Sequence, residues 1–326
     1  MKRYFKTTVW AVTAVLFCAA VAVTSCKKDN SSNIPDDTSS FWDDAYRQHQ
    51  LNGKVKTVKT FSENSTRYNL LEYDSKGNLI KDTSLDSNNP TYYYGSTLTY
   101  DAQNRLTKIV YGNNTVPERE VAEFGYDGSH TAYIPTNIYD MEDLRLQKGV
   151  SSVNYKIQGK EPMNVKCTSV ENNHIIFEGT VGGLASLLGN ISKVEVDCNG
   201  NYPAHLKFMN MGTETASADV TFGSDGIPTK VTYTMDGGET VTTEYTSVAG
   251  FLQMTKQVDS SYPDDYTEYS YNDKGYLMSE VSQDGSGYYY SYEYDTHGNW
   301  TKMTEKYSFE GYERIRTSTR EYTYWE

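Results

Sequence analysis

The chain has 326 residues, with 30 Lys and Arg against 43 Asp and Glu and a formal net charge of −13 at pH 7. The first 25 residues hold three basic residues and no acidic one, so the rest of the chain carries 27 − 43 = −16. Such an acidic surface repels phosphate backbones and anionic lipid headgroups, which argues against a nucleic-acid partner.

Residues 1–25 have the pattern of a cleavable signal peptide. Lys2, Arg3 and Lys6 precede an apolar run that extends from Val9 to Val23. A membrane-spanning helix needs about 20 apolar residues, and this run is shorter. We therefore predict a lipoprotein signal peptide over 1–25, and no transmembrane anchor.

The stretch VTSC, which ends at Cys26, resembles a bacterial lipobox. The resemblance implies that Cys26 becomes the lipidated N-terminus, where two or more acyl chains hold a protein stably on a membrane. Lys27 replaces the Asp that signals inner-membrane retention, which implies the outer membrane, on its periplasmic or its cell-surface side. The alternative is an ordinary signal peptide that ends near a Cys. Residues 26–40 are polar and without periodicity, and predict a flexible tether.

One short helix is expected at the start of the folded part, over 41–50. Ser40 can cap it, and Asn52-Gly53 can end it. Its apolar residues have helical spacing and are Phe41, Trp42, Ala45, Tyr46 and His49.

From residue 54 onward, Thr, Tyr and Val alternate with polar residues in short segments, which is typical of β-strands. The whole of 41–326 is therefore predicted to be one β domain. Its middle part, 134–215, lacks the regularity of the rest and is expected to form an irregular β insertion or cap.

A short pattern recurs five times. The windows are YDSKGNL (73–79), YDAQNRL (100–106), FGSDGIP (222–228), YNDKGYL (271–277) and YDTHGNW (294–300). The second residue is Asp or Asn in four of them and can close a turn through its side chain. The fifth residue tolerates positive φ in every window and is Gly77, Asn104, Gly226, Gly275 or Gly298. Each window therefore predicts a β-hairpin, with a weaker sixth copy at Tyr126.

These windows resemble the YD repeat of RHS-like proteins, and in particular the YD-repeat lipoproteins of Bacteroidetes, in which a segment such as LNGKVKTVKTF (51–61) precedes the repeats. The resemblance covers about 51–111 and 220–326. It implies tandem antiparallel hairpins and no enzymatic role. Large members of the family form a hollow shell, for which five or six hairpins are too few. We therefore expect an all-β open, curved meander or half-barrel with one N-terminal helix.

Two tyrosine clusters are the candidate ligand-binding residues. Side chains alternate along a strand, so Tyr288, Tyr290, Tyr292 and Tyr294 should share one face, with Tyr289 on the other. The second cluster has Tyr92 and Tyr94 on one face and Tyr93 opposite. Aromatic faces of this kind stack on sugar rings or on peptide side chains. The alternative is that both clusters are buried against strands or against the helix.

Cys167 and Cys198 remain after cleavage and lipidation. A disulfide between them would stabilise the fold by about 3–4 kcal/mol on the chain-entropy model. The alternative is two separate buried thiols. The five histidines and the acidic residues lack the spacing of a metal site, and we expect no metal and no cofactor.

The leading hypothesis is a non-enzymatic outer-membrane lipoprotein, a β-repeat binding or scaffold module for a glycan or an envelope protein. The first alternative is a lipid or lipoprotein carrier with a curved sheet and a helical lid. The second is a polysaccharide hydrolase, which would need two carboxylates at a set separation.

Overall fold

The computed structural model describes residues 49–135, 146–159, 162–180, 192–199, 202–222, 228–235, 237–248 and 251–326. The described residues form β-strands and the connections between them. The strands of the first half are β1 (Val55–Ser62), β2 (Arg67–Tyr73), β3 (Leu79–Asp86), β4 (Asn89–Tyr100), β5 (Leu106–Asn113), β6 (Glu120–Gly125), β7 (Tyr133–Pro135), β8 (Leu146–Lys148), β9 (Ser152–Ile157), β10 (Met163–Glu171) and β11 (His174–Thr180).

The second half continues in the same way. Its strands are β12 (Lys193–Asn199), β13 (Tyr202–Asn210), β14 (Thr213–Phe222), β15 (Pro228–Met235), β16 (Thr240–Val248), β17 (Phe251–Asp259), β18 (Tyr262–Tyr271), β19 (Leu277–Ser282), β20 (Gly287–Tyr294), β21 (Trp300–Phe309) and β22 (Tyr312–Tyr324).

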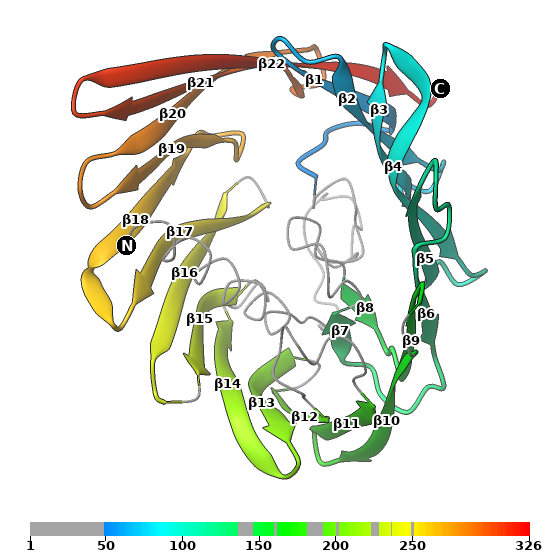
Figure 1. The fold of residues 1–326 in the computed structure, drawn as a ribbon. Helices are drawn as coiled ribbons and strands as arrows, with labels where there is room; N and C mark the ends of the chain where they lie inside the picture. The colour runs from blue at the N-terminus through cyan, green and yellow to red at the C-terminus, as the bar shows by residue number, and fades with distance from the viewer. Residues whose placement is uncertain are drawn as a thin grey trace, which may run out of the picture.

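Twenty of these strands form one closed antiparallel ring (Figure 1). Each strand pairs with the next along the chain, except that β6 pairs with β9 and thereby leaves out β7 and β8. The ring closes where β22 pairs with β1, over a register from Val55 opposite Tyr324 to Ser62 opposite Ser318. Twenty strands about 4.8 Å apart give a ring about 30 Å across, too wide for facing side chains to meet.

The inner face of the ring carries the apolar side chains. Figure 1 places β7, β8 and the segment before β1 within the ring. His130, just before β7, meets Phe177 of β11 edge to face at 5.8 Å, which identifies the face of Phe177 as the inner one. One buried cluster spans β11–β16, with Val231 at its centre, and a second spans β1–β6 and β9, with Val58, Leu79 and Leu106. The core is therefore a lining of the ring wall.

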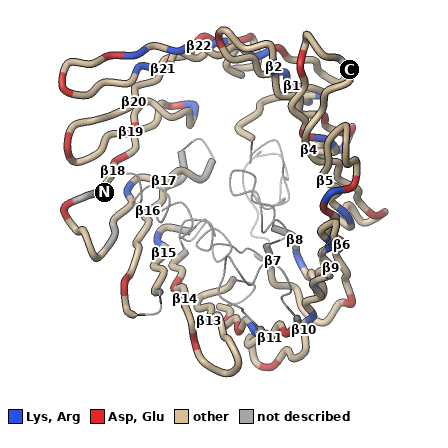
Figure 2. Tube along the Cα trace, viewed as in Figure 1, with Lys and Arg blue, Asp and Glu red and all other residues tan. Residues whose placement is uncertain are grey.

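Basic and acidic residues are both distributed along the strands of the ring (Figure 2), and many of them pair across strands on the outer face. Cross-strand ion pairs of this kind contribute roughly 0.2–1 kcal/mol each. They include Glu72–Lys81 at 3.0 Å, Lys156–Glu123 at 3.1 Å, Lys302–Glu293 at 2.7 Å and Lys306–Glu313 at 2.6 Å. The outer face therefore suits contact with water.

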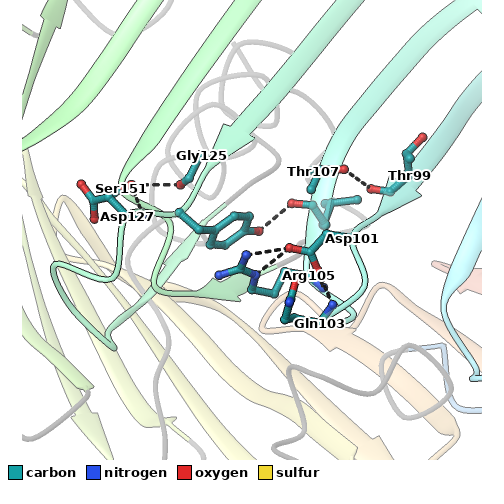
Figure 3. A network of polar contacts seen from close by, with 10 residues as sticks. Thr99, Asp101, Gln103, Arg105, Thr107, Gly125, Asp127 and Ser151 are labelled. Carbon is teal, nitrogen blue, oxygen red and sulfur yellow. Dashed lines mark hydrogen bonds and ion pairs between the residues drawn. The ribbon is translucent and has the colours of Figure 1, made fainter.

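The repeated windows form tight turns at one end of the ring. In the turn between β4 and β5, the Asp101 carboxylate accepts the backbone N–H groups of Gln103 and Arg105 and pairs with the Arg105 side chain (Figure 3). Asn272 accepts two backbone N–H groups in the same way between β18 and β19. The fifth residue of the window has positive φ in four turns, at Gly77, Asn104, Gly275 and Gly298. Gly226 lies outside the described residues.

Tyrosine hydroxyls tie one repeated turn to the next. Tyr100 donates to the carbonyl oxygen of Leu79 at 2.8 Å, and Tyr126 donates to that of Leu106 at 2.6 Å. Tyr322 donates to the carbonyl oxygen of Trp300 at 2.8 Å. In each case the acceptor is the seventh residue of the preceding window, so phenylalanine could not replace these tyrosines without loss of a hydrogen bond.

The expected open half-barrel is wrong, because the ring is closed. The repeated windows lie only at the connections β2–β3, β4–β5, β14–β15, β18–β19 and β20–β21, so the number of windows understates the number of strands. The stretch 134–215, expected as an irregular insertion or cap, contributes β9–β13 to the ring. No helix occurs in the described ranges; of the expected helix at 41–50 only His49 and Gln50 are described, and they lie in a turn. The peptide beyond them packs on the wall through the buried Leu51.

We predict that Tyr126→Phe lowers the free energy of unfolding by about 1–2 kcal/mol, because the bond to the Leu106 carbonyl is lost in a half-buried position. Urea denaturation measures the change. Tyr289→Phe is the matched control, since its ring is exposed on the outer face, and should change stability by no more than about 0.5 kcal/mol. Equal effects of the two substitutions would contradict the role of the hydroxyl.

The stability that the Asp101 carboxylate contributes should depend on pH. Desolvation acts to raise the pKa of Asp101, but hydrogen bonds from Arg105 and Gln103 outweigh it and hold the pKa below its usual value. A lowered folded-state pKa stabilises the protein above the unfolded-state pKa of about 3.9, and this contribution is lost as pH falls through the folded-state value.

Asp101→Asn keeps an acceptor for the turn, as Asn272 does, and loses the ion pair with Arg105. It should be about 0.5–1 kcal/mol less stable than the unsubstituted chain at pH 6. The gap should close as pH falls below about 3.9 in denaturation curves. A gap that does not change with pH would show that the carboxylate charge contributes nothing.

Candidate functional site

The two candidate tyrosine clusters lie on different parts of the wall. Along β20, Tyr288 and Tyr290 alternate with the exposed Tyr289, and the first two point to the inner face. Along β4, Tyr94 pairs with Ser84 and lies on the inner face, and Tyr93 is on the outer face. Six strand spacings of about 4.8 Å separate β4 from β20, so the clusters do not form one site.

Strands β18–β22 bring seven tyrosines together on the inner face. We refer to these as the tyrosine wall: Tyr269, Tyr271, Tyr288, Tyr290, Tyr292, Tyr294 and Tyr307. The register sets Tyr288 opposite Tyr307, and their ring centroids lie 4.9 Å apart. Tyr292 and Tyr294 pack on Tyr276 at 5.4 and 5.7 Å. The rings of β20 and β21 thus form an aromatic surface, and Tyr269 and Tyr271 lie beyond β19 on the same face.

The side chains of the tyrosine wall are half-exposed. All seven of its tyrosines have intermediate exposure. Neither buried cluster includes a buried residue from β18–β22. Met278 lies on β19, between the tyrosines of β18 and those of β20, and keeps 36% of its surface exposed. A ligand can therefore reach these rings, whereas much of the apolar lining of β1–β6 and β9–β16 is buried in the two clusters.

Burial keeps several phenol groups of the wall protonated. Burial raises the pKa of Tyr269, Tyr271 and Tyr290, and the nearby charge of Glu280 raises all three further. Burial also raises the pKa of Tyr276 to about 12. Tyr269, Tyr271, Tyr276 and Tyr290 therefore stay neutral, and Tyr271 donates its O–H group to the carbonyl oxygen of Met254 at 2.7 Å.

Charged side chains share the wall with the tyrosines. Glu280 lies between Tyr269 and Tyr288 in the register. Glu305 lies opposite Tyr290 on one side and Arg316 on the other. The guanidinium of Arg314 lies 5.9 Å from the centroid of the Tyr307 ring. The wall thus offers aromatic faces, carboxylates and guanidinium groups to one ligand.

Other predicted site residues lie elsewhere. Cys167 and Cys198 are free thiols that pack on the cluster of β11–β16. They therefore form no disulfide with each other, as in the alternative of two separate thiols. Burial raises the pKa of Cys198 to about 11, which keeps it protonated. Cys26 lies outside the described residues. Within the described ranges, His, Cys, Asp and Glu form no group that could hold a metal ion.

Sequence reasoning missed Tyr269, Tyr307 and Glu280 as neighbours of Tyr288. Alternation along each strand could place them on a face, but only the strand register places them side by side. That register depends on the lengths of the turns at 282–287 and 309–312.

Among the described residues there is no helix with the length and apolar character needed to cross a bilayer.

No protein-family model and no curated protein matches this sequence. Among solved structures, the fold is similar to a porin-like protein from Bacteroides uniformis ATCC 8492, with 8% identity and a TM-score of 0.35 over 83% of this chain and 98% of that one. A porin-like protein from Bacteroides vulgatus ATCC 8482 has 10% identity and a TM-score of 0.30, with the same shares. The complex TcdB2-TccC3-Cdc42 has 10% identity and a TM-score of 0.22, over 74% of this chain and 17% of that one. None of these likenesses carries an argument about function.

Proposed function

We propose that this protein is a non-enzymatic binding protein of the cell envelope, anchored by lipid at Cys26 in the outer membrane, and that it binds a glycan on the tyrosine wall. One observation carries the proposal: the tyrosine wall gathers seven half-exposed tyrosines on one stretch of the inner face. An aromatic surface that the protein's own side chains leave open is available to a ligand.

The chemistry of the wall suits a saccharide. A pyranose ring has apolar C–H faces that stack on aromatic rings, and hydroxyl groups around its edge. Tyrosine supplies both an aromatic face and a hydroxyl at the end of the ring. Glu280, Glu305 and Arg316 add acceptors and donors on the same face. Stacking and hydrogen bonding along the stripe on β20 would together position several sugar units.

The outer face supports a barrel that stands in water beyond a lipid anchor. Barrels that cross membranes present an apolar band about 25 Å tall to the lipid. Here the outer face has ion pairs such as Lys108–Glu123 and Lys256–Glu268, whose residues lie at least two positions inside the ends of their strands. Transfer of these charges into hydrocarbon would be costly. We therefore assign membrane attachment to Cys26 and the tether 26–40.

The two alternative functions have less support. A lipid carrier needs an accessible apolar cavity, but the buried clusters hold most of the apolar lining, and the accessible part of the wall consists mainly of Tyr, Glu and Arg, with Met278 as an apolar exception. A hydrolase would use a pair of carboxylates such as Glu280 and Glu305. We assign both carboxylates to recognition of the ligand. A bound oligosaccharide should therefore remain intact, as detected by mass spectrometry.

We predict that Tyr288→Ala and Tyr290→Ala each weaken glycan binding about tenfold, because the loss of one stacking face costs about 1–2 kcal/mol. The mature chain with Cys26→Ser is first screened on a glycan array, and isothermal titration calorimetry then measures the affinity for the glycan retained.

Tyr289→Ala is the matched control, since Tyr289 lies between the two on the outer face, and it should leave the affinity unchanged. Equal weakening by all three substitutions would rule out the wall as the binding site. If no glycan is retained by the unsubstituted chain, the proposal fails. Release of shorter oligosaccharides would contradict the assignment as non-enzymatic.

A further inference from the structure

The inner face of β22 carries a row of arginines. Side chains alternate along the strand, and the register with β21 places Arg314, Arg316 and Arg320 on the inner face. Both acidic residues of the strand, Glu313 and Glu321, fall at the positions between and point outward. A chain with a formal net charge of −13 therefore places three positive charges on one strand of its lumen.

Two of these arginines are available to a ligand. The Nε of Arg320 donates to the Thr60 hydroxyl at 3.2 Å, and its guanidinium lies 4.1 Å from the centroid of the Trp300 ring. By contrast, Arg314 is half-exposed and Arg316 is exposed. Among the described residues, no carboxylate forms an ion pair with either of them, and the Nε of Arg314 has no hydrogen-bond partner.

Nearby carboxylates do not cancel the positive charge. Glu305 lies opposite Arg316 in the register, on the neighbouring strand β21. Glu63, in the turn after β1, accepts the backbone N–H of Thr317 at 3.1 Å. Glu280 lies on β19, three strand spacings or roughly 14 Å from β22. The three arginines of β22 against the two nearer carboxylates leave 3 − 2 = +1 on this part of the wall.

Aromatic rings adjoin the guanidinium groups. Tyr307 lies opposite Arg314, and the guanidinium of Arg314 lies 5.9 Å from the centroid of the Tyr307 ring. Tyr288 follows on the next strand, with its ring centroid 4.9 Å from that of Tyr307. A uronic acid has the C–H faces of a pyranose and a carboxylate at the edge of its ring. A uronic acid stacked on these two tyrosines would extend its carboxylate toward Arg314 and Arg316.

We propose that Arg314 and Arg316 bind the carboxylate of an acidic sugar, so that the glycan on the tyrosine wall contains uronic acid units. This inference rests on the proposed glycan binding, and it names the class of sugar. A guanidinium group stays charged at any ordinary pH and binds a carboxylate through two parallel N–H···O bonds. A neutral hexose stacks on the same rings but offers the arginines no charge.

The test is calorimetry with tetragalacturonate and with its methyl ester, which has the same backbone without the charges. At pH 7 and low salt, tetragalacturonate should bind about tenfold more tightly. The preference should shrink in about 0.5 M NaCl, because salt screens charges that are open to solvent. Arg316→Gln should remove most of the preference and leave the affinity for the ester within about twofold.

Lys306→Gln is the matched control. Lys306 lies on the outer face of β21, opposite Ile315 and therefore between the levels of Arg314 and Arg316. This substitution removes the same charge from the other side of the wall and should keep the preference for tetragalacturonate.

Thermal melting of each variant shows whether it folds, and Arg314→Gln is a second variant that should also reduce the preference. Equal binding of the two tetramers would overturn the uronic acid site and leave the proposed glycan binding intact. A preference that survives both arginine substitutions in folded protein would overturn the assignment to these residues. If neither tetramer binds, but inorganic sulfate binds and Arg316→Gln abolishes this, the anion site stands and the glycan proposal fails.

Discussion

The pairing of β22 with β1 is the contact on which the rest of the structure depends. A meander of antiparallel hairpins has two edges, each with a row of unpaired backbone N–H and C=O groups that invites association with other chains. Here Val55–Ser62 runs antiparallel to Ser318–Tyr324, so both edges are satisfied within the chain. Closure also gives the sheet an inner face that encloses a lumen. Without it, the face that carries Val58, Leu79 and the tyrosine wall would be one side of an open sheet.

Tyrosine serves two purposes in this ring. Near the repeated turns its hydroxyl bonds the carbonyl of the preceding repeat, as between Tyr126 and Leu106, and so fixes the spacing of neighbouring hairpins. On β18, β20 and β21, tyrosine side chains form the half-exposed tyrosine wall. A ring about 30 Å across cannot fill its interior from the wall alone. Tyrosine tolerates this position because its ring packs laterally on other rings while its hydroxyl finds a hydrogen-bond partner, as Tyr271 does at the Met254 carbonyl and Tyr292 at the Leu277 carbonyl. The composition, with 30 tyrosines against ten phenylalanines, reflects both uses.

The parts of the fold that depend on short-range chemistry were accessible from the sequence. A turn such as 295–299 is determined within five residues by the Asp295 side chain and the positive φ of Gly298, and the alternation of Tyr288 with Tyr289 follows from the pleat. Closure was not accessible, because it joins residues such as Thr57 and Thr323 that are 266 positions apart. The neighbours of Tyr288 were not accessible either. The placement of Glu280 beside it depends on the strand register, in which a shift of one residue would turn the carboxylate to the outer face.

Closure of the ring can be tested by an engineered disulfide between its first and last strands. Thr57 and Thr323 lie opposite each other on the outer face, with their hydroxyl oxygens 2.7 Å apart. In a chain without its native thiols, Thr57→Cys with Thr323→Cys should form an intramolecular disulfide on mild oxidation, detectable by mass spectrometry of proteolytic fragments. Thr57→Cys with Thr319→Cys should not, because Thr319 pairs with Phe61, four residues further along. Absence of the first cross-link in folded protein, or equal formation of both, would contradict a closed ring with this register.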